Sequence, residues 1–419
     1  MMKYTASEPP TRTMKRILFL GGAAMQMPPI RYARQQGHYV ITCDYLPENP
    51  GHQLADEYHN VSTTDMKAVL EVARNAEIDG IVAYASDPAA PTAAYVGNAL
   101  GLVSNPYESV LTLARKDLFR RFLRDHGFHV PRSESFDSVN EARDYAQTLK
   151  LPIFVKPVDS SGSKGVTQLQ DLDGFETAFS HALSYSRAKK VVVEERICRQ
   201  GYQVAGDGFV VDGQLAFRCF ANEHFDKLCS GLVPIGESFP AIHDSRLLDL
   251  AHRETQRLLT LLGMKTGALN FDFVFTEAGE FYFLELGPRN GGNLIPEVIN
   301  YTTGVDLVKY TVDAALGFDC SALKMEPAHG CYSSYIVHAL RDGTYQELRM
   351  TERFKTHVVQ QNIWVKPGDP VRQFNGSNDT LGTAILRFES QAEMLAMMDN
   401  MENDIRVQTV RKARQPVPA

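Results

Sequence analysis

The stretch NFDFVFTEAGEFYFLELGPRNGGN, residues 270–293, alternates apolar and polar residues on both sides of Ala278-Gly279. This alternation predicts a β-hairpin that turns at that dipeptide. Either a two-residue turn or a four-residue loop there places Asp272 directly opposite Glu285. The predicted hairpin therefore carries two neighbouring carboxylates on one face.

Two directly opposed carboxylates destabilise an ordinary sheet by up to about 1 kcal/mol. A divalent cation bound between them would remove that repulsion. Oxygen-only ligands favour Mg²⁺ or Mn²⁺, and Mg²⁺ is commonly held by one or two carboxylates together with substrate phosphates. The alternative is a sheet edge on which both acids are solvated.

Upstream of the hairpin, the loop DSSGSKG at residues 159–165 joins two strand-like runs, IFVKP and VTQLQ. Its hydroxyls and accessible N–H groups suit a phosphate, although the Walker pattern G-x-x-x-x-G-K-[ST] is absent. An exposed turn is the alternative. Lys156 lies in the apolar run before this loop and needs an anionic partner there, unless it is an edge-strand lysine that reaches water.

Two further cations flank these elements. Lys116 lies in Arg115-Lys116-Asp117, where the alternative is a solvated helix residue. Arg289 follows the hairpin, where a turn would direct its guanidinium group at the phosphate ligands of the ion. The alternative for Arg289 is a surface turn.

The N-terminal part of the chain predicts a parallel sheet with helices on both faces. RILFLGG at residues 16–22, a helical stretch and YVITCDY at 39–45 form a β-α-β pattern, which MKAVLEVARNAE and IDGIVAYASD extend. Ligands of such sheets lie at the carboxyl ends of the strands. The weak substrate-binding candidates there are Gly22, Gln26, Asp44 and Asp87.

The pattern changes at Asn105, where Asn105 and Glu108 predict a capping box at the start of a helical segment that stops at Gly127. Residues 247–262 predict another helix. Beyond residue 330 a mainly β tail is expected, with turns at Lys366-Pro367-Gly368-Asp369 and Asn375-Gly376-Ser377-Asn378.

The composition excludes several classes of protein. The 419 residues suffice for about three domains, and 44% apolar with 22% charged residues is typical of globular chains. A net charge of −7 argues against nucleic acid as a partner. The polar residues 1–13 predict a disordered leader without a signal peptide, and no apolar run is long enough for a membrane span. Six cysteines without a C-x-x-C pair predict a reduced cytoplasmic protein and suggest no zinc cluster.

Taken together, residues 14–330 resemble the ATP-grasp superfamily, specifically its carboxylate–amine ligase branch. The resemblance implies a mixed α/β and α+β fold. A Rossmann-like domain is expected at 14–104, an ATP-grasp domain at 105–330 with its lid at about 150–195, and a β-rich C-terminal region at 331–419.

The resemblance also implies roles for individual residues. Asp272 and Glu285 match the metal ligands, and Arg289 matches the catalytic arginine near the transferred phosphate. VVVEERI matches the hinge that holds adenine. The ATP-binding residues implied are Lys116, Lys156, Ser160, Ser161, Gly162, Ser163, Gly165, Glu194, Glu195 and Gln203.

Two positions depart from the family pattern. Gln203 stands where a ribose-binding Glu is frequent, so the ribose contact is weaker or differently shaped. Gly287 stands where E-x-N-P-R has a metal-binding Asn. Either one metal site has fewer ligands, or Asn290 or Asn293 supplies the oxygen.

The implied activity is ATP-dependent ligation of a carboxylate to an amine through an acyl phosphate, which yields ADP and phosphate. The implied cofactors are ATP and Mg²⁺ (or Mn²⁺), and the expected partners are small molecules, with a homodimer left open. Alternatives are a biotin carboxylase-like or purine-pathway enzyme and a nucleotide-binding regulator without turnover. His224, Lys227 and His243 are further candidates for substrate contact.

Overall fold

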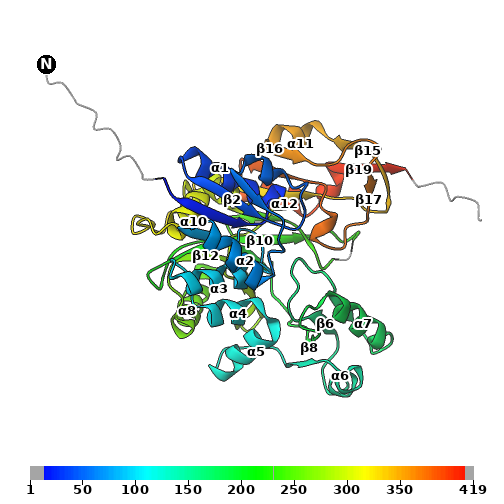
Figure 1. The fold of residues 1–419 in the computed structure, drawn as a ribbon. Helices are drawn as coiled ribbons and strands as arrows, with labels where there is room; N and C mark the ends of the chain where they lie inside the picture. The colour runs from blue at the N-terminus through cyan, green and yellow to red at the C-terminus, as the bar shows by residue number, and fades with distance from the viewer. Residues whose placement is uncertain (1–13, 230, 411–419) are drawn as a thin grey trace, which may run out of the picture.

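The computed structural model describes residues 14–229 and 231–410, so the leader expected at 1–13 lies outside the described residues (Figure 1). The chain begins with a parallel sheet in the order β3-β2-β1-β4. This alternation of strands and helices confirms the Rossmann-like N-terminal unit. Its elements are β1 (Arg16–Leu20), α1 (Met27–Gln35), β2 (Tyr39–Cys43), β3 (Glu57–His59), α2 (Met66–Asn75), β4 (Gly80–Val82) and α3 (Ala90–Leu100).

Two helices, α4 (Tyr107–Ala114) and α5 (Lys116–Asp125), follow this sheet. The capping box expected at Asn105 is wrong, because the Asn105 side chain is used elsewhere: its Oδ1 accepts the Lys265 N–H at 2.7 Å. The amide of Asn98 caps the helix instead and accepts the Tyr107 N–H at 3.0 Å.

A small antiparallel sheet in the order β5-β8-β6-β7 forms the lid and stands apart from the rest of the chain (Figure 1). Helices α6 (Val139–Ala146) and α7 (Phe175–Tyr185) pack on it around a core of their own. Its strands are β5 (Ser133–Phe136), β6 (Ile153–Pro157), β7 (Thr167–Leu169) and β8 (Val191–Glu195). Strand β6 is an interior strand, so Lys156 is not an edge-strand lysine.

The main sheet has eight antiparallel strands in the order β13-β12-β9-β10-β11-β14-β18-β16. Strands from both sides of residue 330 share it, so the β-rich C-terminal region continues this sheet. The expected domain limits at 104 and 330 stay predictions. The strands are β9 (Val204–Val211), β10 (Gln214–Phe225), β11 (Pro234–Phe239), β12 (Gly267–Phe275), β13 (Phe281–Gly287), β14 (Cys331–Val337), β16 (Val358–Ile363) and β18 (Gly382–Phe388).

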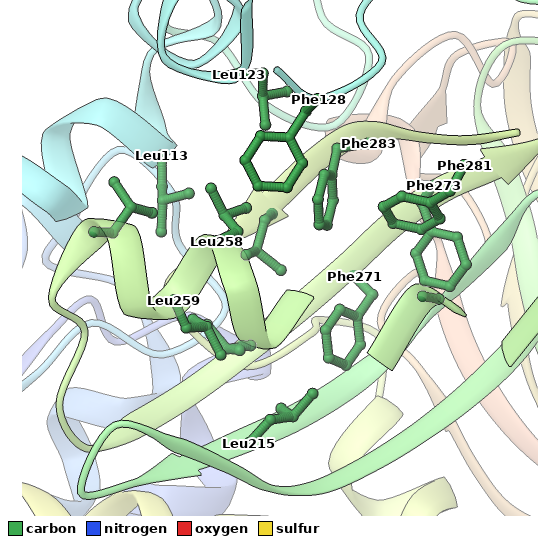
Figure 2. Close-up of a cluster of buried hydrophobic side chains, with 14 of the residues drawn as sticks. Leu113, Leu123, Phe128, Leu215, Leu258, Leu259, Phe271, Phe273, Phe281 and Phe283 are labelled. Atoms are coloured by element: carbon green, nitrogen blue, oxygen red, sulfur yellow. The ribbon is translucent and has the colours of Figure 1, made fainter. Parts of the chain in front are cut away.

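Alternation along β12 gives the two faces of this sheet different roles. Phe271 and Phe273 point into a core shared with α8 (Ser245–Leu262), as Figure 2 shows. Asp272, between them, points to the opposite face. Helices α9 (Ile295–Thr303) and α10 (Leu307–Ala315) pack over the apolar part of that opposite face. The polar part of this face, which carries Asp272, is not covered by these two helices and forms a wall of the candidate site.

The hairpin register confirms that Asp272 lies directly across from Glu285. The expected turn is wrong, however, because three residues connect Thr276 to Glu280, and Gly279 N–H donates to Thr276 O at 2.9 Å. A β-bulge after Asp272 then shifts the register by one residue. The bulge, and not the turn, therefore places the two carboxylates opposite each other.

The C-terminal region also contains a three-stranded sheet in the order β17-β15-β19. Its strands are β15 (Gly343–Met350), β17 (Pro370–Val371) and β19 (Ile405–Val410). Two helices absent from the sequence prediction, α11 (Glu352–His357) and α12 (Gln391–Met398), flank the β-structure. Across 14–229 and 231–410, no helix has the length and apolar character needed to span a membrane.

Candidate active site

A cavity of about 570 Å³ lies between the lid and the polar face of the main sheet. Predicted site residues from distant parts of the sequence meet at its walls: Lys116, Lys156, Ser160, Gly162, Ser163, Glu194, Glu195, Gln203, Asp272, Glu285 and Arg289. The remaining predicted residues, Ser161, Gly165, Gly22, Gln26, Asp44 and Asp87, do not line it.

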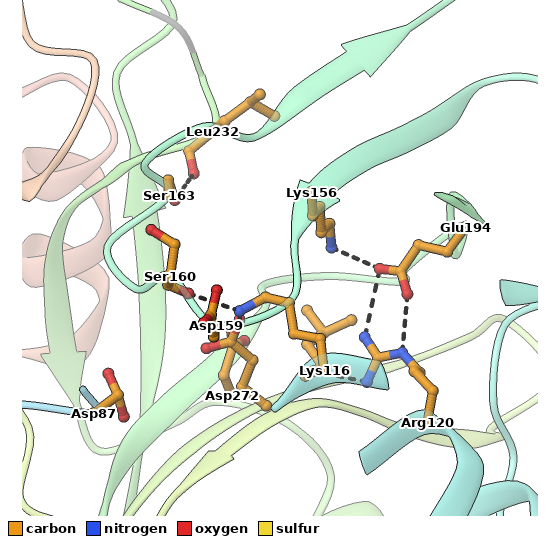
Figure 3. Close-up of polar contacts among 12 residues, drawn as sticks. Asp87, Lys116, Arg120, Lys156, Asp159, Ser160, Ser163, Glu194, Leu232 and Asp272 are labelled. Carbon is orange, nitrogen blue, oxygen red and sulfur yellow. Dashed lines mark hydrogen bonds and ion pairs between the residues drawn. The ribbon is translucent and has the colours of Figure 1, made fainter. Parts of the chain in front are cut away.

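Lys156 is held by a buried ion-pair network, which Figure 3 shows. Its Nζ lies 2.6 Å from Glu194 Oε1, and Arg120 Nε lies 2.9 Å from Glu194 Oε2. Burial opposes ionisation of Glu194, but Arg120 and Lys156 outweigh it and hold the pKa of that carboxyl below its ordinary value. The anionic partner expected for Lys156 is confirmed. Because two cations engage its carboxylate, Glu194 positions Lys156.

Lys116 connects the hairpin to the loop at residues 159–165, which we call the flap. Its Nζ lies 2.5 Å from Glu285 Oε1 and donates to Ser160 O at 3.0 Å. Only 11% of its side chain is exposed, so the solvated-helix alternative is wrong. The lysine lies at the first residue of α5, and its side chain therefore reaches the site from the same turn that begins the helix.

Asp272 has a different partner from Glu285. Gln203 Nε2 donates to Asp272 Oδ1 at 2.7 Å, so the residue expected near ribose contacts the hairpin carboxylate. Burial, and then the charge of Glu285, raise the pKa of Asp272 to about 7. The carboxylates thus face the cavity with one donor each, and the alternative of two fully solvated edge acids is wrong.

The flap crosses from the lid to the far wall of the cavity. Ser163 Oγ donates to Leu232 O at 2.9 Å, and Ser377 N–H donates to Gly162 O at 3.3 Å (Figure 3 shows the first contact). Gly162 has a φ of +63°, a conformation that favours glycine. The loop is therefore not a free surface turn.

Arg289 forms a bidentate ion pair with Asp87 from the N-terminal unit, with Nε 2.7 Å from Oδ1 and Nη2 2.5 Å from Oδ2. Burial opposes ionisation of Asp87, yet the Arg289 charge lowers the pKa of Asp87. A Cβ on Gly287 would lie 3.0 Å from Asp87 Oδ1 and 3.2 Å from Arg289 Cζ. The ion pair thus occupies the space that a side chain at position 287 would need, which explains the glycine there.

Neither asparagine expected to compensate for Gly287 lines the cavity. Asn290 Oδ1 accepts the Thr311 hydroxyl at 2.9 Å, and Asn293 lies beyond the cavity wall. Asn270 does line it and lies directly across from Gly287 in the hairpin. Its Nδ2 donates to Asp207 Oδ1 at 2.9 Å, which leaves its amide oxygen as the atom of this side chain that could accept or ligate.

The sequence interpretation missed further acids on the same sheet face. Glu223 on β10 and Glu237 on β11 are directly opposed and line the cavity. Among the described residues, Oε2 of each is buried without a hydrogen-bond partner. Burial, followed by neighbouring carboxylates, raises the pKa of both well above the ordinary value. A signal exists in the sequence, since each Glu occupies a position of a strand-like run whose neighbours two residues away on both sides are apolar.

The N-terminal candidates gather at the carboxyl ends of the parallel strands, as expected, but their polar groups form hydrogen bonds within the protein. Gly22 N–H donates to Asp44 Oδ2 at 3.2 Å, and Gln26 Nε2 donates to Tyr84 O at 3.0 Å. His224, another candidate, lines the cavity, and Asp399 and Ser238, each 2.8 Å away, hold its imidazole. Lys227 also lines the cavity, whereas His243 does not.

Glu297, in the first turn of α9, gives a pH prediction. Burial raises its pKa from 4.5 to about 7, with Asp306 and Asp207 adding to the shift. The folded chain thus holds this proton more tightly than the unfolded chain, and the free energy of unfolding falls as pH rises from about 4.5 to about 7. We expect Glu297→Gln to match wild type near pH 4 and to be up to about 3 kcal/mol more stable at pH 8 in denaturant titrations. Parallel pH profiles of the two proteins would contradict this, and the exposed Glu277→Gln serves as the control.

The geometry defines a cavity between a lid and a carboxylate-bearing sheet, with lysine and arginine side chains on its walls. Residues 115–323 match the family "Carbamoyl-phosphate synthase L chain, ATP binding domain". The chain belongs to this family, whose domain is an ATP-grasp domain, and the resemblance to the ATP-grasp superfamily is thereby confirmed.

Individual relatives agree with this family. The chain is 25% identical over 341 residues to the uncharacterized protein y4rH of Sinorhizobium fredii (strain NBRC 101917 / NGR234), covering 78% of this chain and 69% of that protein. It is 28% identical to the carbamoyl phosphate synthase large chain of Thermoanaerobacter sp. (strain X514), over 54% of this chain but only 20% of that protein. It thus spans a fifth of that large chain.

Solved structures show the same fold over nearly the whole chain. The L-amino acid ligase from Bacillus licheniformis superposes with a TM-score of 0.79 at 17% identity, covering 96% of this chain and 100% of the other. Phosphoribosylglycinamide synthetase from Anaerococcus prevotii gives 0.73 at 20% identity, covering 95% and 100%. The fold class implied by the resemblance is confirmed.

Proposed function

We propose that the chain is an ADP-forming ligase that joins a small-molecule carboxylate to an amine. The observation that carries this proposal is the convergence of Lys116, Lys156, Asp272, Glu285 and Arg289 on one cavity between lid and sheet. Three cations suit a triphosphate, and two opposed carboxylates suit the metal that accompanies it.

The nucleotide lies with its base at the lid end of this cavity and its phosphates toward the hairpin. Phe154, Ile197 and Leu284 line the lid end and offer apolar contact to a flat base. Glu195 and the backbone of β8 lie beside them. The phosphates would reach Lys156 and the flap. Glu285 would hold the metal, and Lys116, now paired with Glu285, would then contact the phosphates.

Asp272, Glu285 and the amide oxygen of Asn270 would hold the metal. All three are hard oxygen donors, as Mg²⁺ or Mn²⁺ requires. When bound, the ion supplies neutralisation of the charge that develops on the transferred phosphoryl group. Gln203 then keeps Asp272 oriented, in place of a direct contact with ribose.

The reaction proceeds in two displacements. A carboxylate oxygen of the substrate attacks the γ-phosphorus, the bond to the bridging oxygen breaks, and ADP leaves. The amine nitrogen then attacks the acyl carbon, phosphate leaves with the C–O bond pair, and the nitrogen loses a proton. Lys156, Lys116 and Arg289 stabilise the phosphoryl charge, and the flap excludes water from the acyl phosphate.

The amine lies at the Glu223–Glu237 end of the cavity. Two opposed buried carboxyl groups with unpartnered oxygens accommodate a cationic group far better than an anionic one, because a cation beside them would favour their ionised forms and so offset the raised pKa values. We therefore infer that at least one substrate carries an ammonium group. The six free cysteines suit the cytoplasmic location expected from the sequence. The homodimer stays a prediction.

An ATP-binding regulator without turnover is the second candidate. Gly287 and the Arg289–Asp87 pair favour it, since the first removes a metal ligand and the second engages the arginine. A biotin carboxylase-like or purine-pathway reaction would use the same phosphoryl transfer with bicarbonate or formate as acceptor.

Hydroxylamine trapping tests the ligase directly. An acyl phosphate is a mixed anhydride, so hydroxylamine converts it to a hydroxamate even without the natural amine. In a screen of small carboxylates with Mg·ATP, we expect one hydroxamate for each ADP released. Hydroxamate accompanied by AMP and pyrophosphate would contradict the proposal, because the intermediate would then be an adenylate. ATP binding without turnover across the screen would favour the regulator.

A further inference from the structure

A second cluster of metal-ligating side chains lies outside the residues assigned to ATP. Asp226 and Cys229 follow β10, and His338 follows β14. One carboxylate oxygen, the thiol sulfur and one imidazole nitrogen of these residues all lie within 4.8 Å of one another. Asp226 and His338 are buried, and Cys229 is partly buried. Two distant segments of the chain thus bring three different ligand types to one point.

Hydrogen bonds around the cluster orient the His338 and Asp226 side chains toward each other. His338 Nδ1 lies 2.8 Å from Ile336 O and donates to that carbonyl, which leaves Nε2 facing Asp226. Leu228 N–H donates to Asp226 Oδ1 at 2.6 Å and fixes the carboxylate. A ring N–H bound to a backbone carbonyl is the usual support of a metal-bound histidine.

A simple ion pair accounts for only part of this arrangement. His338 Nε2 and Asp226 Oδ2 are 3.0 Å apart, so a cation must lie between them, either a proton on the imidazole or a metal ion. A proton explains these two residues but does not involve Cys229, whose thiol would then only pack against the neighbouring apolar cluster. A metal ion uses all three groups.

We propose that Asp226, Cys229 and His338 bind a zinc ion, with water as the fourth ligand. A set of sulfur, nitrogen and oxygen donors suits Zn²⁺, whereas Mg²⁺ avoids thiolate. Binding releases the thiol proton, and the thiolate and carboxylate together balance the two charges of the ion. The site is independent of the proposed ligase activity.

Zinc at this position stabilises the surface on which the flap rests. The segment that carries Asp226 and Cys229 leads to Leu232, whose carbonyl accepts the Ser163 hydroxyl. The ion joins that segment to the end of β14. It therefore has a structural role beside the cavity, distinct from the metal held by Asp272 and Glu285.

Cobalt titration of the metal-free full-length protein tests this site. With saturating Mg²⁺ present to occupy oxygen-only sites, Co²⁺ should produce a thiolate-to-cobalt charge-transfer band, and Zn²⁺ should abolish it by displacement. Cys229→Ser should lose the band, and His338→Gln should weaken Co²⁺ binding by at least ~10–100-fold. Cys331→Ser, a matched cysteine outside the cluster, should keep the band.

The wild-type protein alone can overturn the proposal. If metal-free wild type shows no charge-transfer band with Co²⁺, or if Zn²⁺ leaves its melting temperature unchanged, the cluster is an ion pair and no zinc site. A band that persists in Cys229→Ser would equally overturn it, because another thiolate would then be the ligand.

Discussion

Asp272→Asn and Glu285→Gln are each expected to lower ADP formation by about a thousandfold or more while leaving the chain folded. Loss of a metal that neutralises transferred phosphoryl charge is worth several kcal/mol, and each 1.36 kcal/mol is a factor of ten in rate. Both substitutions keep the size of the side chain. They also remove the repulsion between the opposed carboxylates.

The two variants are expected to differ in melting temperature. Asp272→Asn relieves a carboxylate whose pKa is raised by burial, so this variant should melt at or above the wild-type temperature at pH 8. Glu285→Gln loses the Lys116 ion pair and should gain less. Glu277→Gln, exposed at the turn of the same hairpin, is the matched control and should keep full activity. Normal turnover in both site variants would show that the metal lies elsewhere.

Lys156→Ala should lower kcat/KM for ATP by about 10²–10³-fold, the usual cost of one preorganised group that stabilises transition-state charge. The fold should survive, because Arg120 still neutralises Glu194 after the substitution. Hydroxamate formation should fall in proportion to ADP formation, since Lys156 acts on the phosphoryl group.

The matched control for Lys156 is Lys150→Ala, an exposed lysine of the same lid. It removes one positive charge without touching the cavity and should leave kcat/KM unchanged. If both variants lose activity equally, long-range charge and not contact with phosphate explains the effect. If neither does, the assignment of Lys156 is wrong.

The hairpin shows what the sequence could predict. Alternation around Ala278-Gly279, together with an assumed turn of two or four residues, predicted Asp272 opposite Glu285, and the register agrees. The turn itself was mispredicted, and a bulge compensated for the error. Sequence patterns do not show bulges, since one extra residue leaves the overall alternation of a short strand recognisable.

The site residues that the sequence analysis did not predict become neighbours only through tertiary contacts. Glu223 and Glu237 become neighbours only when β10 pairs with β11, and Arg120 becomes a partner of Glu194 only when α5 packs against the lid. Burial of unpaired acids also runs against the general preference for exposed charge. The Asp87–Arg289 pair joins residues that no local pattern connects.

The prediction of a helix cap at Asn105 was wrong for a related reason. Its position before a helix satisfied the local rule for a cap, yet its amide accepts a hydrogen bond from the distant loop between α8 and β12. Local rules state which contacts a residue type can make, and packing decides which of them form. The same reasoning applies to the proposed zinc site, because His338 follows β14 and lies far along the chain from Asp226 and Cys229.

Binding of Mg·ATP to the full-length protein, measured by titration calorimetry, tests the central claim most directly because it needs no knowledge of the other substrates. The account predicts one site that requires Mg²⁺, is weakened in Asp272→Asn and Glu285→Gln, and raises the stability of the protein by about 2.7 kcal/mol at a hundredfold excess over Kd. Absence of binding heat together with an unchanged thermal melt at saturating Mg·ATP would contradict it.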